Sequence, residues 1–119
     1  MNESVSTGQL VEPAEWLSLP EVAERLDLGL NQVRQLVRDR SLLAVRRDGK
    51  LRVPAELIAP TVRKHLPGVL TLLHDAGYNE EEALRWLYTA DPSLPGMPAA
   101  ALSGDKATEV KRRAQALGF

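Results

Sequence analysis

The chain contains 119 residues, of which 44% are apolar and 26% are charged, and its formal net charge is −1. This size suits one compact domain, or two small ones that share a core. The sequence has no cysteine, no apolar run long enough to cross a membrane and no secretory signal, so we expect a cytoplasmic protein without disulfides, thiolate chemistry or membrane association.

The N-terminal residues are expected to form a flexible tail that extends to residue 16, because they combine small and turn-forming residues without an apolar period. The stretch SLPEVAERLDLG then predicts a first helix. Ser18 and Glu21 have the spacing of a capping box at its start. We expect the helix to end where Asp27 or Gly29 adopts a left-handed backbone conformation, which both residue types tolerate.

A second amphipathic helix follows directly in LNQVRQLVRDR. Its apolar residues repeat at helical spacing, at positions 30, 33, 36 and 37. Two short helices joined by about three residues form a helix-turn-helix candidate. The remaining faces of the second helix carry polar side chains, namely Asn31, Gln32, Arg34, Gln35 and Arg38.

The segment LAVRRDGKLRVP, residues 43–54, predicts a two-stranded hairpin, because Asp48-Gly49 is a strong signal for a type I′ turn. With that turn, Arg47 lies opposite Lys50. We expect the Arg46 stem on the face that packs against the core, and we expect the other face to present the cations Arg47, Lys50 and Arg52. Like charges directly opposite each other are unfavourable, so a group outside the hairpin should compensate them.

The chain after the hairpin predicts only helices and loops. A short helix is expected in AELIA, a longer one from Pro67 to a terminal Gly77, and another after Asn79, which has Glu82 at capping-box spacing. A proline-rich loop and a last helix from about residue 107 to 117 complete the chain. We therefore predict a mainly helical protein, with a winged helix-turn-helix domain at 17–59 and a helical domain at 60–119.

Positive charge is concentrated in one part of the chain. Residues 28–54 contain seven basic and two acidic residues, whereas residues 1–27 contain one basic and six acidic residues. Focused positive charge favours a polyanionic partner, although a solvated basic face without a partner remains an alternative. In a winged helix-turn-helix, the second helix enters the major groove and the wing contacts phosphates. The predicted DNA contacts are Asn31, Gln32, Arg34, Gln35 and Arg38 from the helix, and Arg47, Lys50 and Arg52 from the wing. In this hypothesis DNA relieves the repulsion between Arg47 and Lys50.

The segment SLPEVAERLDLGLNQVRQLVRDRSLLAVRRDGKLRVPAELI resembles the excisionase-type, MerR-related winged helix-turn-helix modules. Apolar or small residues stand where that motif requires them, and a short strand, a basic turn and an Arg-Val-Pro end follow in order. The sequence departs from the motif at two positions: Asp27 replaces its usual turn glycine, and Gly29 replaces its usual Ser or Thr helix cap.

The segments KHLPGVLTLLHDAGYNEEEALRWLYTADPSL and EVKRRAQAL extend this likeness, because they resemble small actinobacterial winged-helix DNA-binding proteins with a helical C-terminal domain of unassigned role. That resemblance implies DNA binding, and it implies that a Ser/Thr protein kinase phosphorylates a threonine in the N-terminal tail, for which Thr7 is the candidate. A second likeness, of RWLYTADPSLPGMPAAAL to the toxin-binding domains of certain antitoxins, motivates an alternative function as a protein-interaction module.

Other chemistry finds little support in the sequence. His65 and His74 lack further ligands at metal spacing, so no metal or other cofactor is expected. His74-Asp75 lacks a nucleophile elbow or a glycine-rich loop, so we expect no enzyme activity. Trp16 and Trp86 are expected to anchor the core. We predict a DNA-binding protein, a transcriptional regulator or nucleoid-associated factor, that acts on double-stranded DNA as a homodimer formed through its C-terminal helices.

Overall fold

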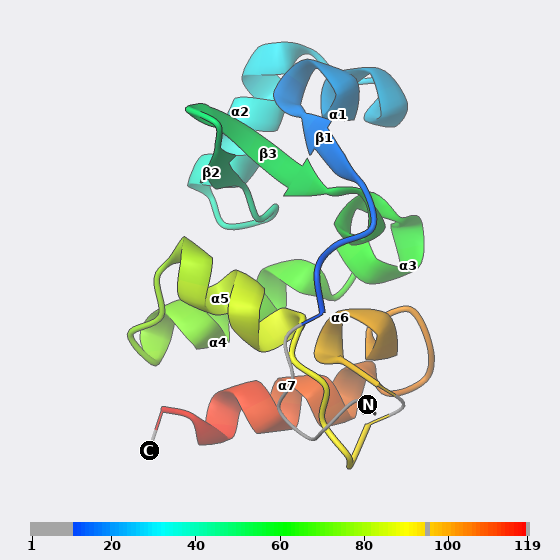
Figure 1. The fold of residues 1–119 in the computed structure, drawn as a ribbon, viewed down its shortest axis with the longest axis vertical. Helices are drawn as coiled ribbons and strands as arrows, with labels where there is room; N and C mark the ends of the chain where they lie inside the picture. Colours follow the sequence, from blue (N-terminus) through cyan, green and yellow to red (C-terminus); the bar gives the residue numbers. More distant parts are fainter. Residues whose placement is uncertain (1–10, 95, 119) are drawn as a thin grey trace, which may run out of the picture.

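The computed structural model describes residues 11–94 and 96–118 and shows two groups of elements along its longest axis (Figure 1). Three short strands and two helices occupy one end: β1 (Trp16–Ser18), α1 (Leu19–Leu26), α2 (Leu30–Arg38), β2 (Val45–Arg47) and β3 (Lys50–Pro54). The 3-10 helix η1 (Ala55–Ile58) and α3 (Pro60–Arg63) lead to the other end. The helices there are α4 (Leu66–Asp75), α5 (Glu80–Leu87), α6 (Pro98–Ala101) and α7 (Ala107–Ala116). The predicted class, a helical protein with a winged helix-turn-helix, is confirmed.

The predicted helix-turn-helix forms with the expected caps. The Ser18 hydroxyl accepts from the Glu21 amide at 3.2 Å, and the Glu21 carboxylate accepts from the Ser18 amide at 2.7 Å, which starts α1 with a capping box. Asp27 ends α1 in the left-handed region, with φ 56°. Gly29 has no side chain to cap α2. The side-chain oxygen Oε1 of Gln32 instead accepts a hydrogen bond from the Gly29 amide at 2.7 Å, which satisfies one of the backbone N–H groups at the start of α2.

The hairpin has the predicted turn and register. Asp48 and Gly49 both have positive φ, 54° and 77°, and Arg47 pairs with Lys50. The sheet is wider than predicted, because β1 pairs antiparallel with β3 and makes a three-stranded sheet in the order β1-β3-β2. The prediction of a two-stranded wing missed β1, since three residues are too few to show an alternating pattern.

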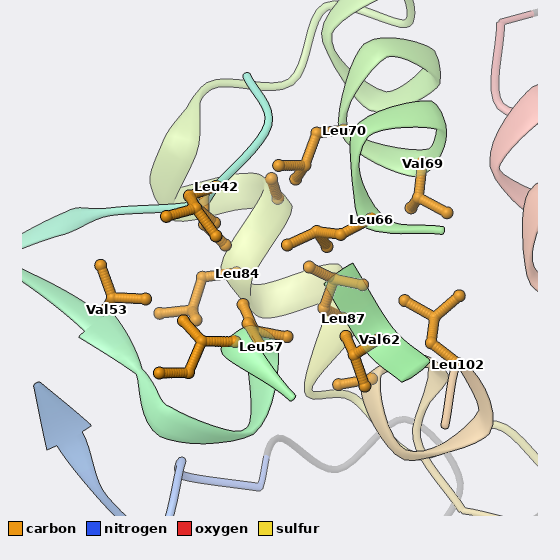
Figure 2. Close-up of a cluster of buried hydrophobic side chains, with 14 of the residues drawn as sticks. Leu42, Val53, Leu57, Val62, Leu66, Val69, Leu70, Leu84, Leu87 and Leu102 are labelled. Atoms are coloured by element: carbon orange, nitrogen blue, oxygen red, sulfur yellow. The ribbon is translucent and has the colours of Figure 1, made fainter. Parts of the chain in front are cut away.

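The start of α5 and the end of α4 form as predicted, whereas α3 and α6 were not predicted: Pro60 begins α3, and α6 begins at Pro98, at the end of the predicted loop. Asn79 and Glu82 form the second capping box, and Gly77 has φ 93° after α4. The side chains of both ends of the molecule meet in one hydrophobic core (Figure 2). Leu42 and Val53 from the winged end lie with Leu66, Leu84 and residues of the other C-terminal helices. The two halves therefore share a core, and both Trp16 and Trp86 pack half-buried against its edge.

Residues 11–15, which the sequence placed in a tail, connect the two halves. The Val11 amide donates to the Tyr88 carbonyl at 2.7 Å, and the Ala14 amide donates to the Glu56 carboxylate at 3.3 Å. The buried Tyr88 hydroxyl donates to the same Glu56 carboxylate at 2.8 Å. Burial raises the pKa of Tyr88, so the phenol stays neutral and acts as a donor. Thr7 lies outside the described residues.

No helix within residues 11–94 and 96–118 has both the length and the apolar character needed to cross a membrane.

Candidate nucleic-acid interface

Helix α2 presents all five of its predicted polar contacts to solvent, while Val33 on its opposite side is completely buried. Three of the five already make intramolecular hydrogen bonds. Gln32 caps its own helix, Gln35 donates to Asp39 at 2.8 Å, and Arg38 donates to Gln35 at 2.8 Å. The side chains of Asn31 and Arg34 make no hydrogen bond among the described residues. These two are therefore the α2 residues most free to bind a ligand.

A groove between the helix-turn-helix and the hairpin collects basic side chains from three elements. We call it the basic groove and define it by four cations, namely Arg34 of α2, Arg46 of β2, and Lys50 and Arg52 of β3. Its remaining lining residues are apolar or neutral: Ser18, Leu19, Pro20, Leu30 and Leu51. No carboxylate of the described residues lines it. Hydrogen bonding to Ser18 lowers the pKa of Glu21 of α1, and the charge of Arg52 adds a smaller effect in the same direction. The groove is thus a concave surface of one charge sign, which concentrates anions.

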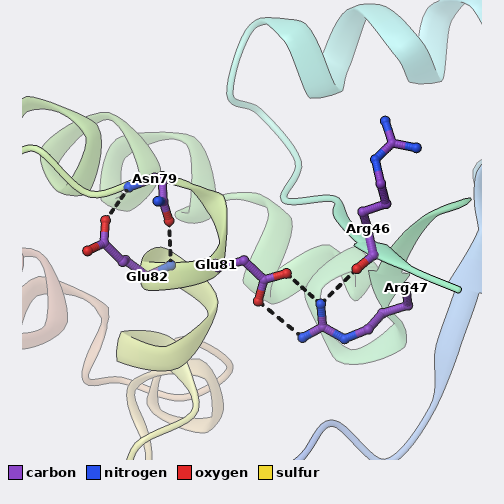
Figure 3. A network of polar contacts seen from close by, with 5 residues as sticks. All are labelled: Arg46, Arg47, Asn79, Glu81 and Glu82. Atoms are coloured by element: carbon purple, nitrogen blue, oxygen red, sulfur yellow. Dashed lines mark hydrogen bonds and ion pairs between the residues drawn. The ribbon is translucent and has the colours of Figure 1, made fainter. Parts of the chain in front are cut away.

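The side chains of Arg46 and Arg47 are exposed and half-buried, respectively, the reverse of the predicted burial. Figure 3 shows their side chains extending in different directions from the end of β2, with Arg47 directed at α5. Arg46 is exposed and lines the basic groove, whereas the prediction placed its stem on the packed face. Arg47, predicted to project freely, is half-buried and has 38% of its side chain exposed. Strand β2 does alternate, with Val45 buried, Arg46 exposed and Arg47 half-buried, but the face that packs is the one that carries Val45 and Arg47.

Arg47 is held by groups from distant parts of the chain. Its guanidinium forms a two-pronged ion pair with Glu81 of α5, in which Nη2 donates to Oε1 at 3.2 Å and Nη1 donates to Oε2. It also lies 5.1 Å from the centroid of the Trp16 ring. Hydrogen bonding to Glu81 raises the pKa of Arg47 further above its usual value. Glu81 therefore compensates the positive charge of Arg47, which lies opposite the like charge of Lys50 in the hairpin.

A neighbouring groove carries acidic side chains. It shares Arg46 and Leu51 with the basic groove and is also lined by the first turn of α5, with Glu80 and Glu81. Arg46 thus borders both the groove with four cations and a groove with two carboxylates. Sequence reasoning had no means to find Glu81 or Trp16 as partners of Arg47, since they are remote in the chain and carry no motif.

The described residues hold no cluster of three His, Cys, Asp or Glu side chains that could bind a metal ion. His65 lies at the start of α4, where desolvation and the nearby charges of Lys111 and Lys64 lower its pKa.

Two domain families match the chain. The winged helix-turn-helix domain of the DNA-binding protein Rv2175c matches residues 5–58, and the Rv2175c C-terminal domain of unknown function matches residues 63–118. The DNA-binding protein Rv2175c of Mycobacterium tuberculosis (strain ATCC 25618 / H37Rv) is 42% identical over 115 residues, which cover 85% of this chain and 79% of that protein.

A second relative and a solved structure support the same assignment. An excisionase of Streptomyces ambofaciens is 36% identical over 52 residues, which cover 44% of this chain and 84% of the excisionase. The NMR structure of Rv2175c matches with a TM-score of 0.81 and 38% sequence identity, and the match covers 98% of this chain and 91% of that one. The match extends over both halves of the fold.

Proposed function

This chain belongs to the Rv2175c family of winged helix-turn-helix DNA-binding proteins, and from that membership we propose that it binds double-stranded DNA with α2 in the major groove and the hairpin on the flanking backbone. The observation that carries this geometry is the basic groove. Its four cations come from the recognition helix and from both strands of the wing, and within residues 11–94 and 96–118 no carboxylate lines it. A phosphate that enters it meets only attractive charge.

The proposed contacts divide between reading bases and binding phosphate. Asn31 and Arg34 are exposed and have no hydrogen bond to exchange within the described residues, which suits bidentate contacts to adenine and guanine respectively. Gln32, Gln35 and Arg38 would have to exchange intramolecular bonds for contacts to DNA. For the wing we propose Arg46, Lys50 and Arg52 as the phosphate contacts, with Arg46 in place of Arg47.

Binding of duplex DNA as a function of salt tests this proposal. The assay is fluorescence anisotropy with labelled genomic fragments at about 50 and 200 mM salt, the range over which phosphate contacts change affinity most visibly. The triple variant R46A/K50A/R52A should lower affinity on every sequence and reduce the slope of log K against log salt by about 2.7, which is about 0.9 for each lost phosphate contact.

The matched control is K64A/K106A/R112A, which removes the same charge from exposed positions of the C-terminal half. It should retain most of the wild-type slope. The DNA proposal fails if the wild-type protein does not bind at the lower salt concentration. The assignment of the groove fails if the triple groove variant behaves like the control.

In the cell we propose that the protein acts as a cytoplasmic transcriptional regulator or nucleoid-associated factor. One copy offers few base contacts, so we also propose a homodimer on a two-part site, joined through the C-terminal helices. Analytical ultracentrifugation with and without duplex DNA tests this point. A complex that contains one protein per site at saturation would contradict it.

We further propose that a Ser/Thr protein kinase modifies Thr7. Phosphate would add negative charge to an arm that already carries Glu3, Glu12 and Glu15, and would thereby oppose DNA binding. The variant T7E should weaken binding, with T7Q as the uncharged control. Mass spectrometry after incubation with such a kinase identifies the modified residue, and incorporation that persists in T7A would contradict the assignment.

A second candidate function is binding of a protein partner through the C-terminal half. It is favoured by a surface hollow beside α5, which is lined by Tyr78, Glu82, Arg85, Trp86 and Thr89. Because the halves share a core, deleting residues 79–119 would disrupt the fold, so point variants are the better test. A stoichiometric partner that co-purifies with wild-type protein but not with R85A or W86A would support this function, and unchanged recovery would oppose it.

A further inference from the structure

We propose that Arg47 is a positioning residue, which fixes the wing for DNA by bridging it to the C-terminal half instead of contacting phosphate. We call the three side chains Trp16, Arg47 and Glu81 the wing strap. Through the wing strap, α5 influences the affinity of the basic groove for DNA. This inference rests on the proposed DNA-binding function, and it assigns a role in that function to the C-terminal half.

The first argument is that three of the five N–H donors of Arg47 are already engaged. Nη1 donates to the Glu81 carboxylate and, at 2.9 Å, to the carbonyl oxygen of Arg46. Nη2 donates to the other Glu81 oxygen at 3.2 Å. The guanidinium also lies over the Trp16 ring at 5.1 Å, within the range of a cation–π contact. A phosphate that took both terminal nitrogens of Arg47 would have to displace the two-pronged contact with Glu81.

The second argument is the charge around Arg47. It lines a hollow with Glu12, Glu81, Arg85 and neutral side chains, on the α5 side of the sheet. Glu12 also interacts electrostatically with Arg47. Two carboxylates therefore accompany Arg47, whereas the basic groove has none in the part of the chain that the structure describes. A DNA backbone that follows the basic groove is directed away from Arg47.

The third argument is mechanical. Strand β2 has three residues and lies at the edge of the sheet, hydrogen-bonded to β3 alone. Arg47 is its last residue before the turn and directly follows Arg46, whose carbonyl it binds. Fixing Arg47 to α5 therefore fixes the backbone that carries the Arg46 guanidinium into the basic groove. Without the strap, the end of the hairpin would move relative to α2. The hairpin cations would then no longer keep fixed positions relative to Arg34 in the basic groove.

Two single variants and their combination test the strap by DNA-binding anisotropy at about 150 mM salt. R47Q and E81Q should each weaken binding by about two- to fivefold, the range for an exposed ion pair. The double variant R47Q/E81Q should bind no more weakly than either single variant, because both remove the same bridge. The salt slope should stay at the wild-type value in all three. E109Q is the matched control, since it removes a carboxylate paired with Arg112 and Arg113 on α7, and it should bind like wild type.

Whether E81Q weakens or strengthens DNA binding distinguishes a positioning role of Arg47 from a direct contact between Arg47 and phosphate. If Arg47 bound phosphate in competition with Glu81, E81Q would strengthen binding and R47Q would lower the salt slope by about 0.9. The charge-swapped variant R47E/E81R adds a rescue experiment. It should bind more tightly than R47E alone by at least twofold, because it restores a bridge between β2 and α5. Stronger binding by E81Q, or no rescue by the swap, overturns the proposal.

Hydrogen exchange of the free protein tests the strap apart from DNA. Amides of β2 and β3 should exchange faster in E81Q than in wild type or E109Q, while those of α4 should not change. If exchange follows this pattern and wild type does not bind DNA, the proposed function fails while the bridge itself stands. If DNA binds but exchange in the hairpin is unaffected by E81Q, the strap fails while the proposed function stands.

Discussion

Tyr88 provides the sharpest test of how the two halves are joined. Its side chain is completely buried directly after the end of α5, and its hydroxyl donates to Glu56 of η1 at 2.8 Å. Y88F removes that hydroxyl and leaves the ring. A hydrogen bond to a charged acceptor contributes about 1.5–3 kcal/mol, and Glu56 is half-buried and can regain water. We therefore expect a loss of about 1.5 kcal/mol in the free energy of unfolding, which lowers Tm by about 4–8 °C in a chain of this size.

Urea and thermal unfolding, followed by circular dichroism, measure the change. Y78F is the matched control, because Tyr78 is half-buried and its hydroxyl makes no hydrogen bond among the described residues. It should stay within about 0.5 kcal/mol of wild type, as substitutions away from buried networks do. If Y88F is no less stable than Y78F, the Tyr88–Glu56 bond does not join the halves and the reasoning is refuted.

Three further predictions concern the fold. W16F and W86F each leave one tryptophan, in different halves that share one core, so the unfolding midpoints measured by fluorescence and by circular dichroism should coincide in both variants. A separate unfolding transition at Trp86 would contradict the shared core. G49A should destabilise the protein by about 1 kcal/mol in urea unfolding, since φ at Gly49 is 77°, and equal stability would argue against the type I′ turn. Hydrogen bonding to Ser18 lowers the pKa of Glu21, so its stabilising effect is complete above the ordinary Glu pKa and is lost as the pH falls through the lowered value. The stability difference between wild type and E21A should therefore shrink from pH 7 to about pH 2.5, and a constant difference would contradict the capping box.

Much of the local structure was predictable because it depends on neighbours in the chain. Ser18 with Glu21 and Asn79 with Glu82 start their helices as predicted, because a capping box needs only residues three positions apart. The hairpin register followed from the Asp48-Gly49 turn alone. The strand β1 was missed for the opposite reason: its pairing with β3 joins segments more than thirty residues apart and leaves no local period.

The sequence by itself determined the family, the helix-turn-helix, the wing and the concentration of positive charge, since each depends on short-range patterns or on composition. The tertiary structure decided which of those charges are available. Two adjacent arginines are indistinguishable in sequence, yet Arg46 lines the basic groove while Arg47 is bound by Glu81 and Trp16. The physical reason is that an ion pair forms wherever folding brings opposite charges together, and the distance along the chain does not limit it. The shared core in turn decides that α5 lies beside the wing, and so places the C-terminal half where it can influence DNA binding.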